Sequence, residues 1–292
     1  MERKKAKMKN EEYKVQENLG KLYIVATPIG NLEDITLRAI RILKEVDIIA
    51  AEDTRHTLKL LNHLDITKPM ISYHRHNEEV KTDELIQKLL EGKNIALVSD
   101  AGTPVISDPG EEIVKVALEN NIKVNPIPGP CALITALIAS GIDAKEFTFL
   151  GFLPLNKKNR KEKLEQIEKQ EITTILYEAP HKLMQTLEEL SEITKNRKIV
   201  LARELTKIHE EYISGTAEKL KENIQDPKGE YVIIIEKNEK SEKQEQKEAL
   251  SELTLQEHYR YYEEKGLSKK EIIKQMAKDR QVNKNEIYQQ FI

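Results

Sequence analysis

The chain of 292 residues has few of the features that mark secreted, disulfide-rich or membrane proteins. A single cysteine, Cys131, cannot form an internal disulfide, which fits a reducing compartment. No apolar run approaches the ~20 residues that cross a bilayer, and the first residues lack the apolar segment of a signal peptide. We therefore expect a cytoplasmic protein that makes no membrane contact.

Aromatic residues and an excess of one charge are also missing. The sequence has no Trp and only 4 Phe, so aliphatic side chains must build the core. It has 47 Lys and Arg against 50 Asp and Glu, a formal charge of -3. Overall charge therefore does not indicate a nucleic-acid-binding protein, and any such surface must be local.

Two common nucleotide-binding motifs are absent. The glycine-rich fingerprint G-x-G-x-x-G does not follow the first apolar run, and the Walker pattern GxxxxGK[ST] does not occur. The sequence therefore offers neither a typical dinucleotide site nor a typical phosphate cradle.

The first half of the chain alternates short apolar runs with segments of helical periodicity. This alternation predicts a parallel sheet with helices on both faces. The expected strands are 22–26, 46–53, 70–74, 95–100 and 123–129, and the expected helices are 36–44, 54–64, 78–92, 111–121 and 130–141.

From about residue 145 the pattern changes, because several expected strands follow each other without long helices between them. This favours a mixed sheet in a second α/β domain. The expected domains are an N-terminal α/β domain at 20–140, a C-terminal α/β domain at 141–237 and a small helical module at 250–292. We expect a disordered extension at 1–19 and a linker at 238–249, since both are charged and poor in apolar residues.

The C-terminal module is expected to resemble a helix-turn-helix. Ser268 and Glu271 have the spacing of a capping box at the start of its middle helix, and Asn283 with Glu286 repeats that spacing with a weaker cap. Its three clustered tyrosines, Tyr259, Tyr261 and Tyr262, could stack on bases, but we expect two of them to belong to the core.

Three loops rich in Gly and Pro follow expected strands: TPIGNLED (27–34), SDAGTPVISDPG (99–110) and PIPGPCA (126–132). Ligands of open α/β sheets bind at the carboxyl ends of the strands. Gly and Pro permit unusual backbone angles and close approach of the main chain. The loops could be ordinary tight turns, but three at successive strand ends favour a binding site for a compact, mostly neutral ligand such as an adenosine with an amino-acid tail.

These loops, together with AEDTRHT, YHRHNE, FLGFLP, YEAPHK and ARELTKIHEE, resemble the small-subunit ribosomal RNA methyltransferases of the tetrapyrrole methylase superfamily. The resemblance covers residues 21 to 236. It implies a class III methyltransferase that binds S-adenosylmethionine in a cleft between two α/β domains and acts as a homodimer. The implied reaction methylates the ribose 2′-oxygen of a decoding-centre cytidine in 16S rRNA, within the small ribosomal subunit.

The resemblance also implies donor-binding residues. In the second and third loops these are Asp100, Gly102, Thr103, Pro104, Val105, Ile106, Cys131 and Ala132, and in the C-terminal domain Tyr177, Ala179, Ala202 and Tyr231.

The first and second loops depart from the pattern of related tetrapyrrole enzymes. Those enzymes have a G-x-G-P-G-D first loop and a GDP second loop, where this chain has TPIGNLED and GTP. The difference argues against a porphyrinoid substrate. It suggests that the first loop lines the entrance for the acceptor, with Asn31 and Asp34 as polar contacts.

Transfer of a methyl group to a hydroxyl depends on positioning and is helped by a base. We take Asp53 as a base or orienting carboxylate and Arg55 as a phosphate contact; the alternative for Arg55 is an ion pair with Glu52 or Asp53. Further candidates are Glu52, His56, His74, His76, Asp100 and Asp108.

His74 and His76 form an H-x-H pair, which alone is a weak metal signal. We therefore predict no metal.

The densest basic run, NKKNRKEK at 156–163, is expected as a loop that leads into a helix at the rim of the cleft. Phosphate contacts require such side chains, and the candidates are Lys157, Lys158, Arg160 and Lys161. The run could instead be a solvated surface. The basic residues of the C-terminal module are a second candidate RNA surface.

Three functions remain open from the sequence. The first is an RNA 2′-O-methyltransferase. The second is a tetrapyrrole C-methyltransferase of the precorrin type, which predicts neither the basic run nor the helical tail. The third is a non-catalytic RNA-binding or nucleotide-binding module.

Overall fold

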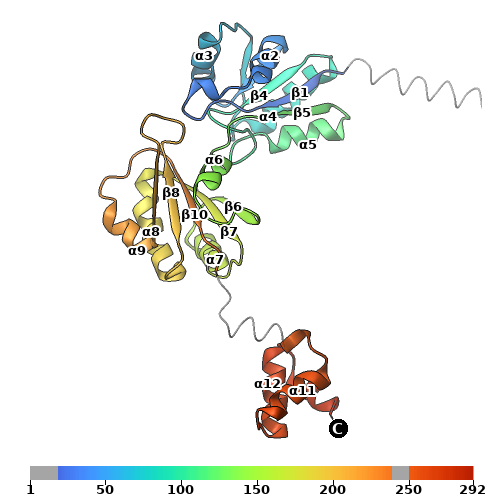
Figure 1. Cartoon of the computed structure of the whole chain (residues 1–292). Helices are drawn as coiled ribbons and strands as arrows, with labels where there is room; N and C mark the ends of the chain where they lie inside the picture. Colours follow the sequence, from blue (N-terminus) through green and yellow to red (C-terminus); the bar gives the residue numbers. More distant parts are fainter. Residues whose placement is uncertain (1–18, 239–249, 292) are drawn as a thin grey trace, which may run out of the picture. The chain divides into compact units, whose positions relative to one another are not determined.

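The computed structural model describes residues 19–238 and 250–291 (Figure 1). Its internal contacts divide the chain into two compact units, one that ends at Glu236 and one that begins at Lys237. The expectations for the N-terminal extension and the linker fall largely outside the described residues.

The first unit contains a parallel sheet, as predicted. Its strands lie in the order β3-β2-β4-β1-β5, and each neighbouring pair is parallel. They are β1 (Lys21–Val25), β2 (Ile48–Ala51), β3 (Met70–Ser72), β4 (Ile95–Val98) and β5 (Lys123–Ile127).

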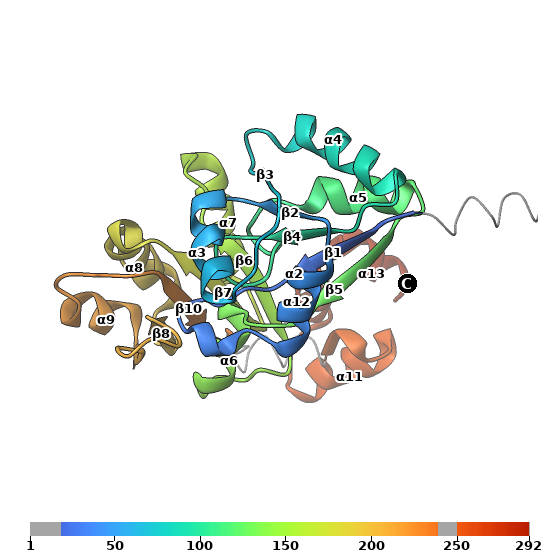
Figure 2. The same ribbon diagram turned by 90° about the horizontal axis from the view of Figure 1, so that it is seen from above.

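Helices cover both faces of this sheet, which confirms the second part of the prediction. One face packs against α2 (Leu37–Glu45) and α3 (Thr54–His63). The other packs against α4 (Glu78–Leu90) and α5 (Glu111–Glu119), on the opposite side in Figure 2. Thr36 begins α2 by accepting a hydrogen bond from the backbone of Ala39, the usual N-cap of a threonine.

The order of the strands creates a binding position. Strands β1 and β4 are neighbours in the sheet. The connection after β1 leads to β2, on the far side of β4, whereas the connection after β4 leads to β5, on the far side of β1. The loops that follow the two strands therefore diverge, and a crevice forms where strand order reverses. The first and second Gly/Pro-rich loops begin at this point.

A second sheet in the same unit is mixed, also as predicted. Its order is β6-β7-β10-β8-β9; β6 and β7 are parallel, and the other pairs are antiparallel. Its strands are β6 (Phe147–Phe152), β7 (Thr173–Glu178), β8 (Ile199–Arg203), β9 (Glu211–Gly215) and β10 (Tyr231–Ile235).

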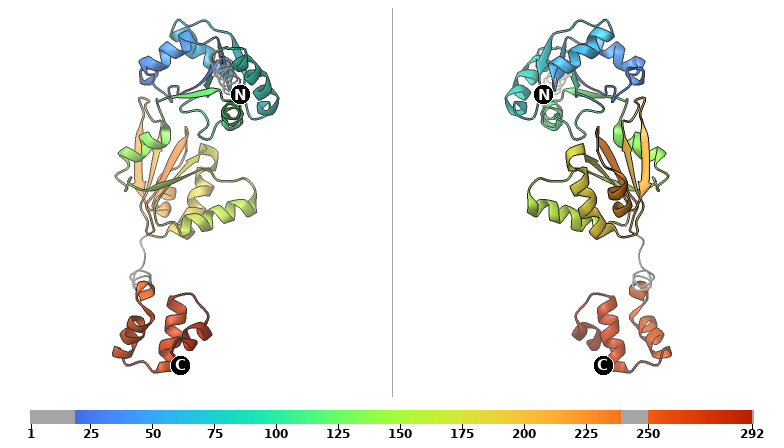
Figure 3. Two further views of the ribbon diagram at one scale, coloured as in Figure 1. Left: turned by 90° about the vertical axis from the view of Figure 1, so that its right-hand side faces the viewer. Right: turned by 90° about the vertical axis from the view of Figure 1, so that its left-hand side faces the viewer.

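The faces of this sheet are covered unequally (Figure 3). One face packs against α7 (Lys157–Glu168), α8 (Pro180–Thr194) and α9 (Ala217–Asn223). The other packs against α6 (Ala132–Ala139), whose Leu133 and Leu137 lie in one buried cluster with residues of the second sheet. The helix that follows the third Gly/Pro-rich loop thus packs on the second sheet.

The second unit is a small helical module, as expected. Its helices are α11 (Leu255–Glu264), α12 (Lys269–Asp279) and α13 (Lys284–Gln289). Ser268 and Glu271 form the predicted capping box. Tyr259 and Tyr262 pack against the apolar core of α12 and α13, so two of the three tyrosines belong to the core.

Across residues 19–238 and 250–291, none of the helices combines the length and the apolar character needed to cross a bilayer.

Candidate functional site

The three Gly/Pro-rich loops come together at the carboxyl ends of the first sheet. Thr27 and Gly102 exchange two backbone hydrogen bonds of 2.9 and 3.0 Å, which join the first loop to the second. The Thr103 hydroxyl donates to the carbonyl oxygen of Pro130 at 3.0 Å, which joins the second loop to the third. The interpretation of these loops as one site is therefore supported by direct contacts among them.

The second loop has a strained backbone. Val105 and Ser107 have φ angles of 75° and 70°, and a β-branched residue such as valine rarely adopts this region. The Val105 side chain packs beside Gly110 and against the core under α4 and α5. Surrounding structure must hold such a conformation in place, and strain of this kind concentrates at ligand sites.

A cavity of about 620 Å³ opens beside these loops, within the size range of small-molecule sites. Both sheets contribute to its walls. The first half of the chain supplies Ile29, Glu52, Asp100, Ala101, Gly102, Thr103, Ile106, Ser107, Asp108, Cys131 and Ala132, and the second half supplies Phe152, Tyr177, Glu204, Leu205, Lys207, Gly229, Glu230, Tyr231 and Val232.

Most of the residues expected to bind the donor line this cavity: Asp100, Gly102, Thr103, Ile106, Cys131, Ala132, Tyr177 and Tyr231. The other four are not among the residues that line it. Pro104 is buried and Val105 packs into the core. Ala179 caps the start of α8, and Ala202 lies buried in the cluster under α6.

Tyr177 connects the cavity to α6. Its hydroxyl oxygen accepts a hydrogen bond of 3.1 Å from the backbone N–H of Leu133, in the first turn of that helix. Burial is the main cause that raises the pKa of Tyr177, so the side chain stays a neutral phenol. It can position a ligand through its ring and hydroxyl but cannot supply a negative charge.

Three carboxylates from the segments that follow β2 and β4 line the cavity: Glu52, Asp100 and Asp108. Burial, followed by the charge of Glu52, raises the pKa of Asp108 to about 7. The hydrogen bond with the Ser99 side chain and the positive charge of Arg75 act in the opposite direction. Burial and then the charge of Asp100 raise the pKa of Glu52. This wall of the cavity therefore contains one group, Asp108, that is able to accept a proton near neutral pH.

Asp53, the predicted base, is not among the residues of the cavity. It caps the start of α3, where its carboxylate accepts a 2.8 Å hydrogen bond from the backbone of Arg55. The Arg55 guanidinium pairs with the same carboxylate at 2.7 Å and holds the pKa of Asp53 well below its usual range. The structure contains the alternative ion pair, and Asp53 is a poor proton acceptor.

The first loop meets the cavity through Ile29 and not through Asn31. Asn31 caps a short 3-10 helix, η2 (Leu32–Asp34), by accepting a hydrogen bond of 3.0 Å from Glu33. Gly30 packs against the loop after β8; a Cβ atom there would lie 2.9 Å from the carbonyl oxygen of Leu205. The loop thus closes against the second sheet by backbone contact.

The basic run forms the start of a helix and not a loop. Asn156 caps α7 by accepting hydrogen bonds from the backbone N–H groups of Lys158 and Asn159. Because the helix begins at Lys157, the residues of the run point in different directions. Lys157, Lys158 and Lys161 are exposed.

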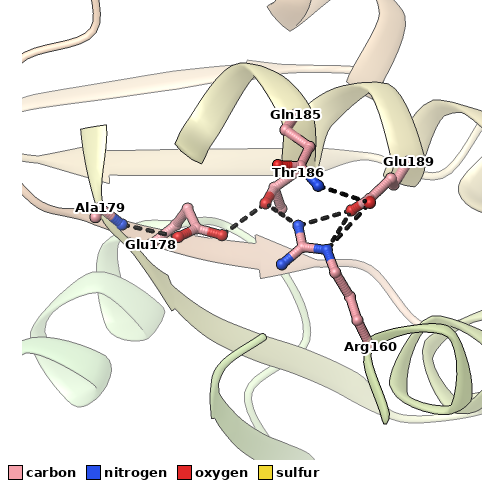
Figure 4. A network of polar contacts seen from close by, with 6 residues as sticks. All are labelled: Arg160, Glu178, Ala179, Gln185, Thr186 and Glu189. Carbon is pink, nitrogen blue, oxygen red and sulfur yellow. Dashed lines mark hydrogen bonds and ion pairs between the residues drawn. The ribbon is translucent and has the colours of Figure 1, made fainter. Parts of the chain in front are cut away.

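Arg160 is the exception in this run, because it is buried. Its guanidinium forms a 2.7 Å ion pair with Glu189 and donates to the Thr186 hydroxyl, which in turn donates to Glu178 (Figure 4). Arg160 therefore fastens α7 to α8. The expectation that it contacts RNA is wrong, since the side chain is buried and its Nε and Nη2 groups bond to residues of α8.

The loop after β8 contributes cavity residues that sequence reasoning missed. Glu204 and Lys207 line the cavity and form an ion pair of 2.9 Å. Glu204 and Thr206 have φ angles of 50° and 66° without being glycines. The motif ARELTKIHEE is part of the family resemblance, but it contains no glycine. No local sign in the sequence therefore indicates that the backbone here adopts positive φ angles.

His74 and His76 lie with their ring centroids 6.0 Å apart. Among the residues that the structure describes, no group of three or more His, Cys, Asp or Glu side chains is arranged to hold a metal ion.

Comparison with solved structures identifies the same fold in diphthine synthase and in a C-methyltransferase. Diphthine synthase matches with a TM-score of 0.58 and 16% identity, over 75% of this chain and 90% of that chain. Uroporphyrin-III C-methyltransferase from Thermus thermophilus, solved with S-adenosylhomocysteine, matches with a TM-score of 0.54 and 16% identity, over 74% and 97%. At this identity the likeness concerns the fold alone.

Sequence comparison gives a closer relationship. The family model of the tetrapyrrole (corrin/porphyrin) methylases matches residues 21–221. The chain is 50% identical to ribosomal RNA small subunit methyltransferase I of Halalkalibacterium halodurans, over 95% of this chain and 96% of that protein. It is 49% identical to the protein of that name from Bacillus subtilis, over 93% and 94%. The chain therefore belongs to the tetrapyrrole methylase family, in the group of ribosomal RNA small subunit methyltransferase I.

Proposed function

We propose that the chain is an S-adenosylmethionine-dependent methyltransferase that 2′-O-methylates the ribose of a decoding-centre cytidine in 16S rRNA. The observation that carries the proposal is the cavity, in which the three Gly/Pro-rich loops meet strand ends of the second sheet. Relatives about half identical over almost the whole chain, and named for the ribosomal RNA of the small subunit, support this substrate.

The residues of the cavity suit the methyl donor. Gly102 has no side chain, and Cys131 and Ala132 have small side chains, so a ligand can approach the main chain of the loops closely. Tyr177 and Tyr231 add aromatic surface. When bound, the donor supplies an activated methyl group on a sulfonium sulfur.

Asp108, which lines the cavity, takes the catalytic role in place of Asp53, which does not. The acceptor hydroxyl must lose its proton as the new bond to the methyl carbon forms, and a carboxylate in the cavity can receive that proton. Burial gives Asp108 a pKa of about 7, close to the pH at which it has to work. Glu52 and Asp100 share this wall, and Glu52 increases the proton affinity of Asp108.

The exposed lysines of α7 are the proposed contacts to RNA phosphates. Lys157, Lys158 and Lys161 begin five residues after Phe152, which lines the cavity. A paired or stacked cytidine must leave its surroundings before its ribose can reach a cavity. We therefore propose a small ribosomal subunit as the substrate, with the enzyme acting as a cytoplasmic homodimer.

A tetrapyrrole C-methyltransferase is the second candidate, favoured by the shared fold with uroporphyrin-III C-methyltransferase. The first and second loops differ from the pattern expected of such an enzyme. A non-catalytic binding module is the third. Calorimetry with S-adenosylmethionine identifies the non-catalytic module only if no affinity is found. If the donor binds, competition by a tetrapyrrole or by ribosomal subunits separates the two enzymes from each other.

The deciding experiment combines purified protein, tritiated S-adenosylmethionine and small subunits from a strain that lacks the gene. Label in 16S rRNA at one alkali-resistant cytidine is the expected result, because a 2′-O-methyl group blocks alkaline cleavage beside it. Donor binding without labelled rRNA would refute the substrate and bring the tetrapyrrole reaction forward.

A further inference from the structure

Strand β6 contains a bulge just before the cavity. Phe147 and Phe149 pair with Thr173 and Ile175 of β7, but the next pair is Phe152 with Tyr177. Two residues of β6 thus stand opposite one residue of β7. Gly151, at the bulge, has a φ of 65°, an angle that glycine adopts at little cost.

The bulge changes the face on which Phe152 lies. Side chains alternate along a regular strand, so residues three apart would lie on opposite faces. Here both Phe149 and Phe152 meet the ring of Tyr177, with centroid distances of 4.8 and 5.7 Å. Bulges beside functional sites commonly redirect a side chain in this way. The extra residue therefore turns Phe152 toward the cavity.

Phe152 remains half exposed in this position. Its exposed fraction is 49%, although it lines the cavity. Its ring stands at 63° to the ring of Tyr177, an edge-to-face contact. Such a contact leaves aromatic surface available for stacking. In a chain with only 4 Phe and no Trp, an exposed phenylalanine ring at a cavity indicates a contact with a ligand.

We propose that Phe152 is the surface on which the base of the acceptor nucleotide stacks. The inference rests on the proposed function, and it names the residue that receives the displaced base. Aromatic side chains are the usual partners of unpaired bases.

The position of Phe152 favours the acceptor base over the adenine of the donor. The donor is expected deeper, beside residues such as Tyr231, which is only 1% exposed. From Phe152 the chain runs through Leu155, which is 79% exposed, to the exposed lysines of α7. A base at Phe152 would therefore have its neighbouring phosphates close to positive charge along the same segment.

The test compares Phe152→Ala, Phe152→Trp and the control Phe147→Ala. Phe147 lies at the other end of β6, is 37% exposed and does not line the cavity. We measure KM and kcat with small ribosomal subunits, the Kd of S-adenosylmethionine by calorimetry, and thermal unfolding of each variant. Phe152→Ala should lower kcat/KM for subunits about tenfold or more, with the donor Kd within about twofold of the unmodified protein. Phe152→Trp should keep most of the activity, and Phe147→Ala should keep all of it.

Two results would overturn the inference while the proposed function stands. Activity of Phe152→Ala equal to that of the unmodified protein would show that no base stacks there. A donor Kd that weakens as much as kcat/KM falls would assign the ring to the donor. Failure of the unmodified protein to label rRNA would instead remove the proposed function, and the inference with it.

Discussion

Gly102 and Ile29 lie against each other in the wall of the cavity: a Cβ atom added to Gly102 would be 3.2 Å from Cγ2 of Ile29. A contact this short is tighter than nine in ten real Cβ contacts, so Ile29 would have to shift by a few tenths of an ångström. Two loops separated by about seventy residues therefore fit together because one of them has no side chain at the contact.

Gly102→Ala should weaken binding of S-adenosylmethionine by about tenfold or more, a change of about 1.4 kcal/mol, because Ile29 must move within the cavity. The left-handed φ of 79° adds a cost of about 1 kcal/mol to folding. Gly266→Ala is the matched control, since Gly266 has the same φ of 79° and nothing within 4 Å of the added atom. It should leave the donor Kd unchanged in calorimetry; equal effects of the two substitutions would reject the argument.

Activity should rise with pH through about 7 and then level, because Asp108 can accept a proton only when it is ionised. Asp108→Asn should lower kcat by about 10²–10⁴ and remove this pH dependence, whereas Asp53→Asn should change kcat little. The measurements are kcat and kcat/KM with subunits from about pH 5.5 to 9, the range in which the group titrates. A large loss in Asp53→Asn together with an active Asp108→Asn would restore the original assignment.

Asp108 should also make the folded protein less stable as pH rises. Its pKa is about 7 in the folded protein and about 3.9 in an unfolded chain. Between these values the folded state binds more protons than the unfolded state, so stability falls with increasing pH. Asp108→Asn should therefore melt at a higher temperature than the unmodified protein at pH 8, and at the same temperature near pH 4. In a domain of this size about 1 kcal/mol corresponds to roughly 2–4 °C. Identical melting curves at pH 8 would contradict the raised pKa.

Arg160→Ala should destabilise the protein by about 3 kcal/mol, the lower end of the usual range for breaking a buried pair, since Glu189 is partly exposed. Lys161→Ala provides the comparison one residue later, because the Lys161 side chain is 79% exposed and its nearest carboxylate oxygen, on Glu165, is 4.0 Å away. Chemical denaturation should separate the two variants clearly. A harmless Arg160→Ala would mean that the network in Figure 4 contributes little.

Removal of Lys157, Lys158 and Lys161 together should weaken binding to the small subunit without affecting stability. Each phosphate contact contributes about 0.7–0.9 to the slope of log K against log salt, so the triple Ala variant should reduce that slope by about 2. The slope is obtained from KM measured over a series of salt concentrations. An unchanged slope would place the phosphate contacts elsewhere, with the C-terminal module as the next candidate.

The sheets and loops could be predicted because their signals are local. Apolar runs marked the strands, and Gly102 and Gly129 marked the loops at their ends. The burial of Arg160 could not be predicted, since it depends on Glu189, a partner 29 residues away on another helix. The charge of the basic run indicated an exposed surface. Because the run is helical, however, one of its side chains, that of Arg160, points into the protein.

The choice of carboxylate failed for a similar reason. Glu52 and Asp53 are adjacent at the end of β2, and neighbouring residues there point in different directions. Only the three-dimensional structure shows that Glu52 lines the cavity while Asp53 begins α3. Phe152 was missed because a bulge, which needs pairing with β7 to be recognised, breaks the alternation that sequence analysis assumes.

The hydrogen bond from Leu133 to Tyr177 has a consequence for motion. Tyr177 belongs to the cavity and Leu133 to the first turn of α6, so the amide proton of Leu133 is protected as long as the phenol stays in place. Any opening that swings Tyr177 away exposes this proton to solvent. Deuterium uptake at this one amide would therefore record how often the cavity opens, and a ligand that rests on the tyrosine ring would slow it.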